Sequence, residues 1–211
     1  MEKINMDKWL RREIYRFFEH SSNPFYMITF TVDVTQLYNY VKANGLSFYY
    51  ALIYLCTNAV NSVENFRYVI RGGEIYLLER REPSFTDLRP GEELFKIVTM
   101  PAGEGLWEFC RGAAEKSAAQ RAFIEPQEES DSLIHFSCTP ALRLTALTNE
   151  RDFTDPSEVL SNTPKLTWGK YTERNGRKEL NLSIEVNHKF IDGLHISRFS
   201  EALENSMEAL G

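Results

Sequence analysis

The C-terminal part of the chain, residues 165–210, constrains the fold more than any other stretch. Residues 165–172 and 178–186 flank Asn175-Gly176, a dipeptide typical of the two-residue turns that join antiparallel strands. The second of these strands alternates apolar and polar residues, which predicts one buried face. Apolar residues at helical spacing follow. The sequence therefore predicts two paired strands that lead into a final helix, with His188 where the second strand ends.

A motif of the form His-x-x-x-Asp-Gly, from His188 to Gly193, follows this strand. Asp192 falls near the N-terminus of the last helix, where a carboxylate accepts hydrogen bonds from free amide groups and suits the helix dipole. His188 fits a general base, because a neutral imidazole accepts a proton near neutral pH. The same short motif also fits an exposed histidine beside a helix cap, and the rest of the chain has to separate these two interpretations.

The composition excludes several classes of protein. A chain of 211 residues is long enough for a sizeable core, and we expect one domain over residues 1–211. The net charge of -6 disfavours nucleic-acid binding through phosphate contacts. No apolar run approaches the ~20 residues of a membrane span, and the N-terminus lacks the apolar core of a secretory signal. The prediction is a cytoplasmic protein with no nucleic-acid or membrane partner.

The spacing of cysteine and histidine predicts no metal site. The chain has three cysteines and four histidines, and none of them pairs at the spacing of metal ligands. Scattered, odd-numbered cysteines fit a reducing compartment. Apart from His188, we expect surface or strand positions for His20 and His135 and a packing or capping role for His195. Cys138 is expected to be a small buried side chain, and Cys56 and Cys110 fall within predicted helices.

The whole chain predicts an α+β fold, a two-layer sandwich of a mixed β-sheet with helices packed on it. The predicted helices span residues 7–20 with Asp7 as cap, a short segment ended by Gly45, 48–61 with Ser47 as cap, 105–122 and a last helix to about 210. The predicted strands are 25–33, 66–70, 74–78, 85–88, 94–100, 133–148, 165–172 and 178–186. Loops are expected at 124–131 and 149–163.

The first predicted helix has two notable features. Its apolar face, Leu10, Ile14, Phe17 and Phe18, has the spacing of a stripe that packs on a core. Arg11 and Arg12 fall in its first turn, where the helix dipole disfavours positive charge. That placement is unfavourable unless a carboxylate from elsewhere compensates.

Five motifs, in order along nearly the whole chain, resemble the chloramphenicol acetyltransferase family. They are Trp9-Leu10-Arg11-Arg12-Glu13, Ser47-Phe48-Tyr49, Ser137-Cys138-Thr139-Pro140, Thr167-Trp168-Gly169-Lys170-Tyr171 and the segment from His188 to Phe199. The catalytic domains of the dihydrolipoyl acyltransferases are similar more distantly, through Asn187-His188-Lys189.

The resemblance implies an α/β sandwich that assembles as a homotrimer with active sites at the subunit interfaces. It implies acetyl transfer from acetyl-CoA to a hydroxyl of a small-molecule acceptor, with chloramphenicol as the default acceptor and antibiotic resistance as the biological role. Neither a metal nor a covalent acyl-enzyme is implied. The resemblance also implies these roles: His188 as the general base, Thr167 beside the oxyanion, Asp192 paired with Arg11 as structural support, and Tyr49, Lys170 and Tyr171 along the coenzyme path.

One departure from the family concerns the oxyanion. The family carries a serine hydroxyl that donates to the tetrahedral oxyanion, and its position falls on Ala146. Losing one such donor typically costs about 10²–10³ in rate. Thr148, on the same face of the expected strand, is the nearer substitute, and a bulge would bring Thr145 inward. Thr167 is a third candidate.

Three functions therefore stay open. The first is the family's acetyl-CoA-dependent O-acetyltransferase. The second is an acyltransferase of the same fold with a different small-molecule acceptor, which the differing pocket residues Pro24, Phe25 and Ala141 favour. The third is a weakly active or inactive paralogue that binds a small molecule or CoA, which Ala146 favours and the retained His188 opposes.

Overall fold

The computed structural model describes residues 1–125, 127, 130–155 and 161–211. Its helices are α1 (Arg12–Glu19), α2 (Thr35–Asn44), α3 (Phe48–Ser62), the 3₁₀ helix η1 (Glu64–Arg67), α4 (Leu106–Ala119) and α6 (Gly193–Glu208). Its strands are β1 (Glu2–Lys3), β2 (Phe25–Asp33), β3 (Tyr68–Arg71), β4 (Glu74–Leu77), β5 (Glu82–Asp87), β6 (Lys96–Thr99), β7 (Leu133–Thr139), β8 (Lys165–Gly169), β9 (Thr172–Arg174) and β10 (Arg177–Asn187).

The main sheet has seven strands in the order β2-β10-β8-β7-β5-β6, with β9 paired to the free part of β10. Its pairs are antiparallel except β5 with β7 and β7 with β8. A second, three-stranded sheet has the order β1-β4-β3. The mixed sheet confirms the predicted fold class.

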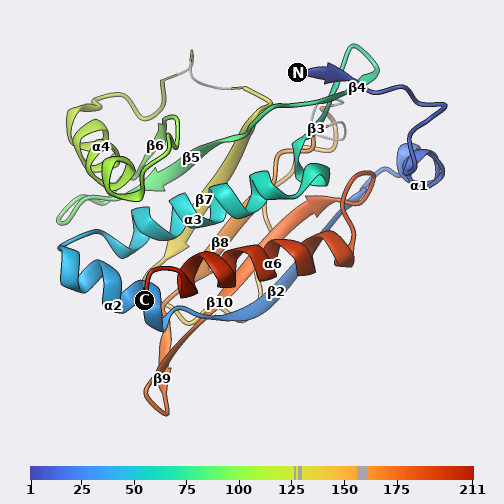
Figure 1. Cartoon of the computed structure of the whole chain (residues 1–211). Coiled ribbons are helices and arrows are strands. Elements are labelled where there is room, and N and C mark those ends of the chain that lie inside the picture. The colour runs from blue at the N-terminus through green and yellow to red at the C-terminus, as the bar shows by residue number, and fades with distance from the viewer. Residues whose placement is uncertain (126, 128–129, 156–160) are drawn as a thin grey trace.

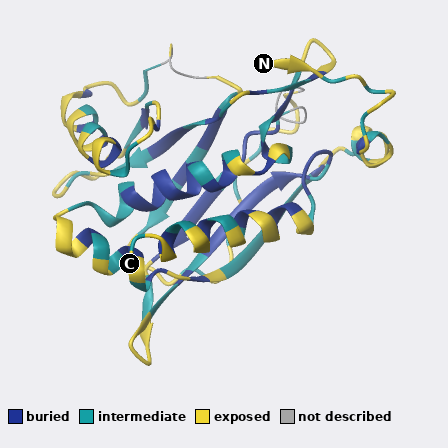
Figure 2. Ribbon diagram, viewed as in Figure 1, coloured by how far each residue is buried: buried dark blue, intermediate teal, exposed yellow. Residues whose placement is uncertain are grey.

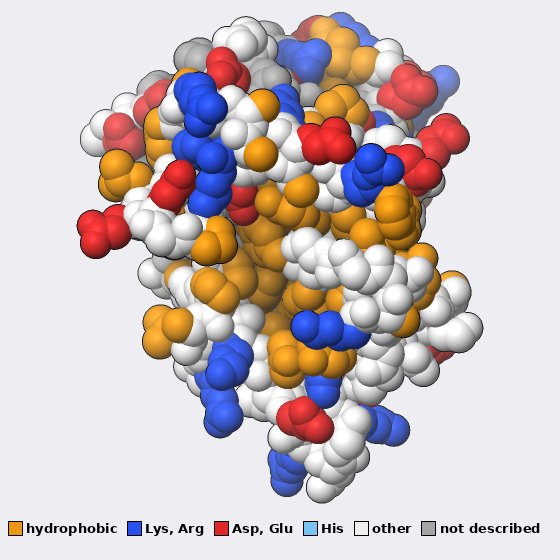
Figure 3. Space-filling view, turned by 90° about the vertical axis from the view of Figure 1, so that its left-hand side faces the viewer, with side chains coloured by type: hydrophobic (Ala, Val, Ile, Leu, Met, Phe, Trp, Pro, Cys, Tyr) orange, Lys and Arg blue, Asp and Glu red, His pale blue; other side chains and the backbone are white. Residues whose placement is uncertain are grey.

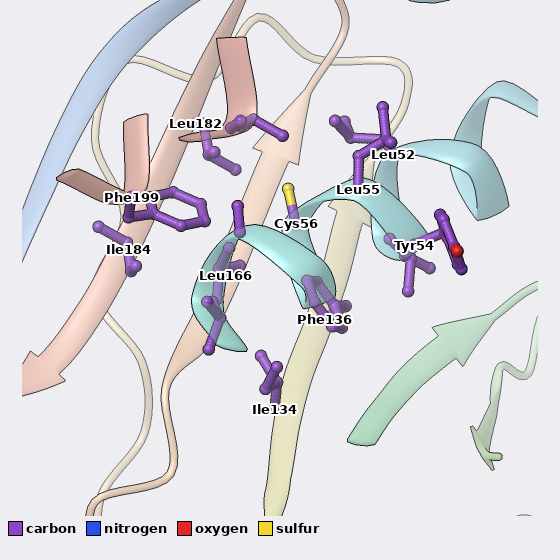
Figure 4. Close-up of a cluster of buried hydrophobic side chains, with 14 of the residues drawn as sticks. Leu52, Tyr54, Leu55, Cys56, Ile134, Phe136, Leu166, Leu182, Ile184 and Phe199 are labelled. Carbon is purple, nitrogen blue, oxygen red and sulfur yellow. The ribbon is translucent and has the colours of Figure 1, made fainter. Parts of the chain in front are cut away.

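Helices α3 and α6 lie across one face of the main sheet, so the molecule has two layers (Figure 1). The strands turn alternate residues toward these helices, and the buried surfaces of both layers face each other (Figure 2). Figure 4 shows the contact: side chains of α3, α6, β7, β8 and β10 meet in one cluster, including Leu52, Cys56, Phe136, Leu166, Leu182 and Phe199. This apolar face accounts for the strand and helix patterns in the sequence.

Several local predictions are confirmed in detail. Ser47 caps α3 by accepting a hydrogen bond from the Tyr50 amide. Gly45 ends α2 in the left-handed conformation, with φ of 65°. Asn175 and Gly176 have φ of 52° and 77°, as the hairpin turn requires. Residues 170–171 interrupt this hairpin, so β8 and β9 pair with different parts of β10.

The first helix differs from its prediction in two ways. It begins at Arg12 with Arg11 as the N-cap residue, and Asp7 does not cap it. Its apolar stripe also faces outward: Leu10 is fully exposed and Phe17 is 79% exposed, while Tyr15 is the buried residue. The helix lies at the margin of the fold beside the N-terminal segment (Figure 1). An apolar stripe therefore remains on the surface of the single chain.

The strand expected over residues 133–148 is also shorter than predicted. It ends at Thr139, and an irregular loop follows. The loop lies on the polar face of the sheet, where Leu142 O accepts from Lys170 N at 2.6 Å and Leu144 O accepts from Asn181 Nδ2 at 2.7 Å. A Cβ at Gly169 would lie 2.3 Å from Leu142 O, so glycine permits this approach. Parts of both expected loops lie outside the described residues: residues 126 and 128–129 of the loop at 124–131, and residues 156–160 of the loop at 149–163.

The fully buried side chain of Arg81 links the two sheets by hydrogen bonds. Its guanidinium donates to the carbonyl oxygens of Phe66 and Tyr68 beside the small sheet, and to those of Asp131, Leu133 and Asn162 beside the main sheet. Burial lowers the pKa of Arg81 to about 9, which leaves the group protonated at neutral pH. In the described residues, none of the helices is long and apolar enough to cross a membrane.

We predict that Arg81→Met lowers the free energy of unfolding by about 3 kcal/mol or more, because it leaves several buried carbonyls without donors. Urea denaturation measures this change. Arg80→Met is the matched control, since Arg80 is partly exposed and its pair with Glu82 has an N–O distance of 3.3 Å. It should cost no more than about 1 kcal/mol. Equal losses in the two variants would contradict the role given to Arg81.

Candidate active site

The turn after β10, residues 188–192, is held by a guanidinium from the other end of the chain. Arg11 is buried and donates from Nε to Lys189 O at 2.9 Å, from Nη2 to His188 O at 3.0 Å and from Nη1 to Asp192 Oδ2 at 2.8 Å. Trp9 lies against the same turn, with its ring centroid 6.1 Å from that of Phe190. These contacts explain why a Trp-x-Arg sequence precedes the first helix, and Asp192 is the compensating carboxylate expected for Arg11.

Other side chains complete the hydrogen bonding of this turn. Asn65 donates to Phe190 O at 2.8 Å, and the Tyr26 hydroxyl donates to Ile191 O at 3.4 Å. The amide of His188 donates to Pro24 O at 2.8 Å. Each carbonyl from residue 188 to 191 therefore has a donor. A backbone turn satisfied in this way holds one conformation and fixes the direction of the imidazole.

The His188 imidazole lies between two aromatic rings. Phe18 stacks on it with centroids 4.3 Å apart, and the Tyr26 ring lies at 4.5 Å. Burial lowers the pKa of His188 below its ordinary value of 6.5, the positive charge of Arg11 lowers it further, and Asp192 opposes the shift. The imidazole is therefore neutral at pH 7 and able to accept a proton.

Asp192 and His195 form the cap of α6. Asp192 Oδ1 accepts from the Leu194 amide at 3.1 Å, and His195 Nδ1 accepts from the Asp192 amide at 3.1 Å. Burial lowers the pKa of His195, and an accepting Nδ1 belongs to a neutral ring. His195 is thus a capping residue, as expected. Burial also lowers the pKa of His135, to about 4, so this strand residue is neutral as well.

A cavity of about 660 Å³ lies between the start of α3, the ends of β5 and β7, and α4. Most of its lining is apolar or aromatic, and Asp87, Thr86 and Ser137 contribute polar atoms. Figure 3 views the side of the molecule on which α4 and the start of α3 lie, and shows hydrophobic side chains gathered in a hollow with Lys and Arg around it. Its lining comprises Ser47, Tyr49, Tyr50, Thr86, Asp87, Leu88, Arg89, Pro90, Phe95, Ala114, Ser117, Ala118, Ser137, Cys138 and Pro140.

The predicted residues of the cavity wall have defined roles in the fold. The Tyr49 hydroxyl donates to Thr86 O at 2.5 Å, and burial raises its pKa, so it remains protonated. Burial raises the pKa of the Cys138 thiol to about 12, which removes it as a nucleophile at neutral pH. Of the cavity residues, Tyr50 belongs to an aromatic stripe, Phe48-Tyr49-Tyr50, that the sequence predicts to be mostly core with some members lining the acceptor pocket. Asp87 and Ser117 were not singled out from the sequence. They come from two other elements, so no local spacing signals them.

A row of hydroxyl groups crosses the polar face of the sheet and reaches the cavity. Thr167 is buried and pairs in register with Ser183 on β10 and with Ser137 on β7. Thr29 and Ser183 hydroxyls lie 2.6 Å apart, and Thr86 Oγ1 lies 3.4 Å from Ser137 Oγ. Thr167 is thus one strand away from a residue that lines the cavity.

Lys170 and Tyr171 lie outside the cavity, at the break between β8 and β9. Lys170 is exposed, and the Tyr171 ring packs against Tyr38 at 5.5 Å and Phe48 at 6.1 Å. Phe48 is adjacent in sequence to Ser47 and Tyr49, which line the cavity. The first turn of α3 therefore separates a half-buried aromatic ledge, formed by Tyr38, Phe48 and Tyr171, from the cavity.

Ala146 lies in a loop and not in the expected strand, which changes the choice of a residue to replace the missing serine. Residues 145–148 form no strand, so strand alternation does not distinguish Thr145 from Thr148, and both are exposed in the single chain. Leu144 binds Asn181, and Asn149 Nδ2 donates to Glu185 Oε2 at 3.0 Å. Because Ser183 lies midway between Asn181 and Glu185, residues 145–148 cross β10 at the level of the hydroxyl row.

The remaining predicted pocket residues lie elsewhere. Phe25 begins β2, and the Arg151 guanidinium lies 3.6 Å from the centre of its ring. Arg151 pairs with Glu185 at 2.6 Å, with both side chains buried. Within one chain, the structure brings together His188, Arg11 and Asp192. It does not bring His188 to the cavity, whose lining comes from other elements.

The fold is the two-layer sandwich of solved acetyltransferase structures. A solved structure of an Azotobacter vinelandii dihydrolipoamide acetyltransferase shares the fold, with a TM-score of 0.68 and 17% identity over 100% of this chain and 93% of that one. A solved chloramphenicol acetyltransferase is more similar, with a TM-score of 0.87 and 27% identity over 97% of this chain and 99% of that one.

The particular family is shown by the sequence. A family model described as chloramphenicol acetyltransferase matches residues 1–204. Chloramphenicol acetyltransferase 3 of Escherichia coli is 25% identical over 206 residues, which are 96% of this chain and 94% of that protein. This chain belongs to the chloramphenicol acetyltransferase family, and it is an acyltransferase.

We predict that Arg11→Gln loosens the turn and raises the pKa of His188 toward its ordinary value, because both the positive charge and the packing that lower this pKa are reduced. Titration of the His188 ring by NMR measures the pKa, and hydrogen exchange of the Phe190 and Ile191 amides reports the turn. Arg12→Gln is the matched control, since Arg12 donates from Nη1 to Asp7 O and does not contact the turn. An unchanged pKa and unchanged exchange in Arg11→Gln would contradict the assignment.

Proposed function

We propose that this protein is an acetyl-CoA-dependent O-acetyltransferase that transfers the acetyl group directly to a hydroxyl of a small-molecule acceptor. The observation that carries the proposal is the neutral His188 imidazole, presented by a turn that Arg11 and Asp192 hold. His188 removes the hydroxyl proton as the oxygen attacks the thioester carbonyl. A C–O bond forms, the C–S bond breaks, and coenzyme A leaves as a thiolate that takes up the proton.

The cavity and the neighbouring ledge suit the two substrates. The cavity, about 660 Å³ and largely apolar, falls in the size range of small-molecule sites. We assign it to the acceptor. Lys170, next to the ledge in sequence, suits the phosphates of the coenzyme, and Tyr171 on the ledge suits its adenine ring. Tyr49, on the cavity side of the same helical turn, lies where the acyl arm would meet the acceptor.

A homotrimer would unite the base with the cavity. His188 and the cavity lie on different parts of one chain, so a site made by one chain alone lacks one of them. The exposed residues Ile14 and Phe17 lie on α1, whose Phe18 stacks on His188, and the exposed Leu10 directly precedes this helix. Such an apolar stripe is typical of a surface that another subunit covers. A sedimentation mass about three times that of the 24.5 kDa chain supports the trimer, and a monomer mass contradicts it.

The oxyanion needs a donor other than the serine that Ala146 replaces. We propose Thr167, because it is the only one of the three candidate threonines that sits in a regular strand between fixed hydroxyl neighbours. Thr148 and Thr145 are the alternatives, since their loop crosses the same row. Of the competing functions, a different acceptor is favoured by Asp87 in the cavity wall, and a weakly active binder is favoured by Ala146.

We predict that a thiol-release assay with acetyl-CoA and chloramphenicol shows turnover by the wild-type protein and a loss of at least about 10³-fold in His188→Ala. kcat/KM should fall as the pH falls, with a midpoint below 6.5, because protonation removes the base. Ala146→Ser should raise the rate by restoring a donor, and Thr167→Ala should lower it by about 10²-fold.

Each variant has an outcome that contradicts a specific assignment. Full activity of His188→Ala would remove the general base and the proposed mechanism with it. Turnover only in Ala146→Ser would mean that the natural chain lacks a working oxyanion donor. If neither the wild type nor Ala146→Ser turns over chloramphenicol, that acceptor is wrong. His20→Ala controls for loss of an exposed histidine.

A further inference from the structure

The acceptor cavity contains a carboxylate without a cation partner. Asp87 ends β5 and faces the cavity. Its Oδ2 accepts hydrogen bonds from the Tyr50 hydroxyl of α3, at 3.2 Å, and from the Ser117 hydroxyl of α4. Oδ1 accepts no hydrogen bond from the part of the chain that the structure describes, and no lysine or arginine there lies within ion-pair distance of Asp87. One oxygen is thus fixed by the protein, and the other is left for a ligand.

The arginine of the cavity wall has other partners. Arg89 also lines the cavity, but its Nη2 donates to Ser117 O and its Nη1 lies 3.9 Å from Glu92 Oε1. Arg89 therefore contacts α4 and its own loop, and it forms no ion pair with Asp87. A carboxylate in a mostly apolar cavity favours a partner that brings a positive charge.

The aromatic walls of the cavity suit the same kind of ligand. Tyr49 and Tyr50 lie with ring centroids 5.7 Å apart, and Phe95 lines the same cavity. Aromatic faces attract cations as well as apolar groups. A ligand with an aromatic or aliphatic body and one ammonium group would match the walls and the carboxylate together.

We propose that the acceptor is an amino alcohol, whose ammonium group binds Asp87 while a hydroxyl receives the acetyl group. This deepens the proposed acetyltransferase function and rests on it. An ammonium held by Asp87 has no free electron pair, so the amine is not acylated and the hydroxyl is the nucleophile. Chloramphenicol itself carries a neutral amide where this acceptor carries an amine.

The test compares chloramphenicol with its deacylated amine, which keeps the aryl diol and replaces the dichloroacetamide by an ammonium group. Titration calorimetry, without acetyl-CoA, measures binding of both compounds to the wild type, Asp87→Asn and Glu93→Gln. We expect the amine to bind the wild type at least about tenfold more tightly than chloramphenicol. Asp87→Asn should lose that preference, and Glu93→Gln, which removes an exposed carboxylate outside the cavity lining, should keep it.

Turnover separates this inference from the proposed function. Thiol release with the amine, with the product identified as an ester by mass spectrometry and hydroxylamine lability, supports both. Preferred binding of the amine without turnover by any variant supports the Asp87 site and contradicts acetyl transfer to this acceptor. Equal binding of the two compounds to the wild type overturns the inference even if chloramphenicol is acetylated, and this comparison holds whether or not Asp87→Asn folds.

Discussion

The guanidinium of Arg11 fixes the geometry on which the candidate site depends. It spans the chain from its first helix to the turn after its last strand and satisfies two carbonyls and one carboxylate at once. A lysine has no planar fork and could not bind three acceptors in this arrangement. Asp192 offsets the cost of burying this charge. Burial alone would raise the pKa of Asp192, but the hydrogen bond from Arg11 helps to lower it below its ordinary value, so the carboxylate stays charged. The imidazole of His188 gains its direction from the same group, and the charge of Arg11 adds to burial in lowering the pKa of that imidazole.

The two faces of the main sheet have different roles. The apolar face packs against α3 and α6 and makes the core, while the polar face carries the row of hydroxyls that contains Thr167 and Ser137. The loop after β7 is bound to that polar face by Asn181 and Glu185, so residues 145–148 are placed over the row. The same end of β7 forms one wall of the acceptor cavity. Thr167 and Ser137, which belong to the family's motifs, thus lie side by side on the polar face next to the cavity. The base, His188, does not line this cavity within a single chain.

The sequence predicted most of what local patterns encode. The hairpin at Asn175-Gly176, the cap at Ser47 and the strand that ends at His188 all rest on residues adjacent in sequence, and each is confirmed. Other features depend on distant partners. The stripe of Leu10 and Phe17 has helical spacing, but spacing does not say what covers it. The segment after Pro140 has strand propensity, yet it is held by the backbone amide of Lys170 and by the β10 side chains of Asn181 and Glu185. The orientation of Asp87 depends on hydrogen bonds from Tyr50 and Ser117, and no sequence pattern connects these residues to it.

The central claim is that His188 of one subunit serves the cavity of another, and mixing two inactive variants tests it most directly. His188→Ala removes the base, and Ala114→Trp fills the cavity from the exposed side of α4. Each should be inactive alone in the thiol-release assay. Equal mixtures, unfolded and refolded together, should regain up to about a quarter of wild-type activity, because that fraction of interfaces joins an intact base to an intact cavity. No recovery from mixed oligomers that are shown to form would contradict a site shared between subunits.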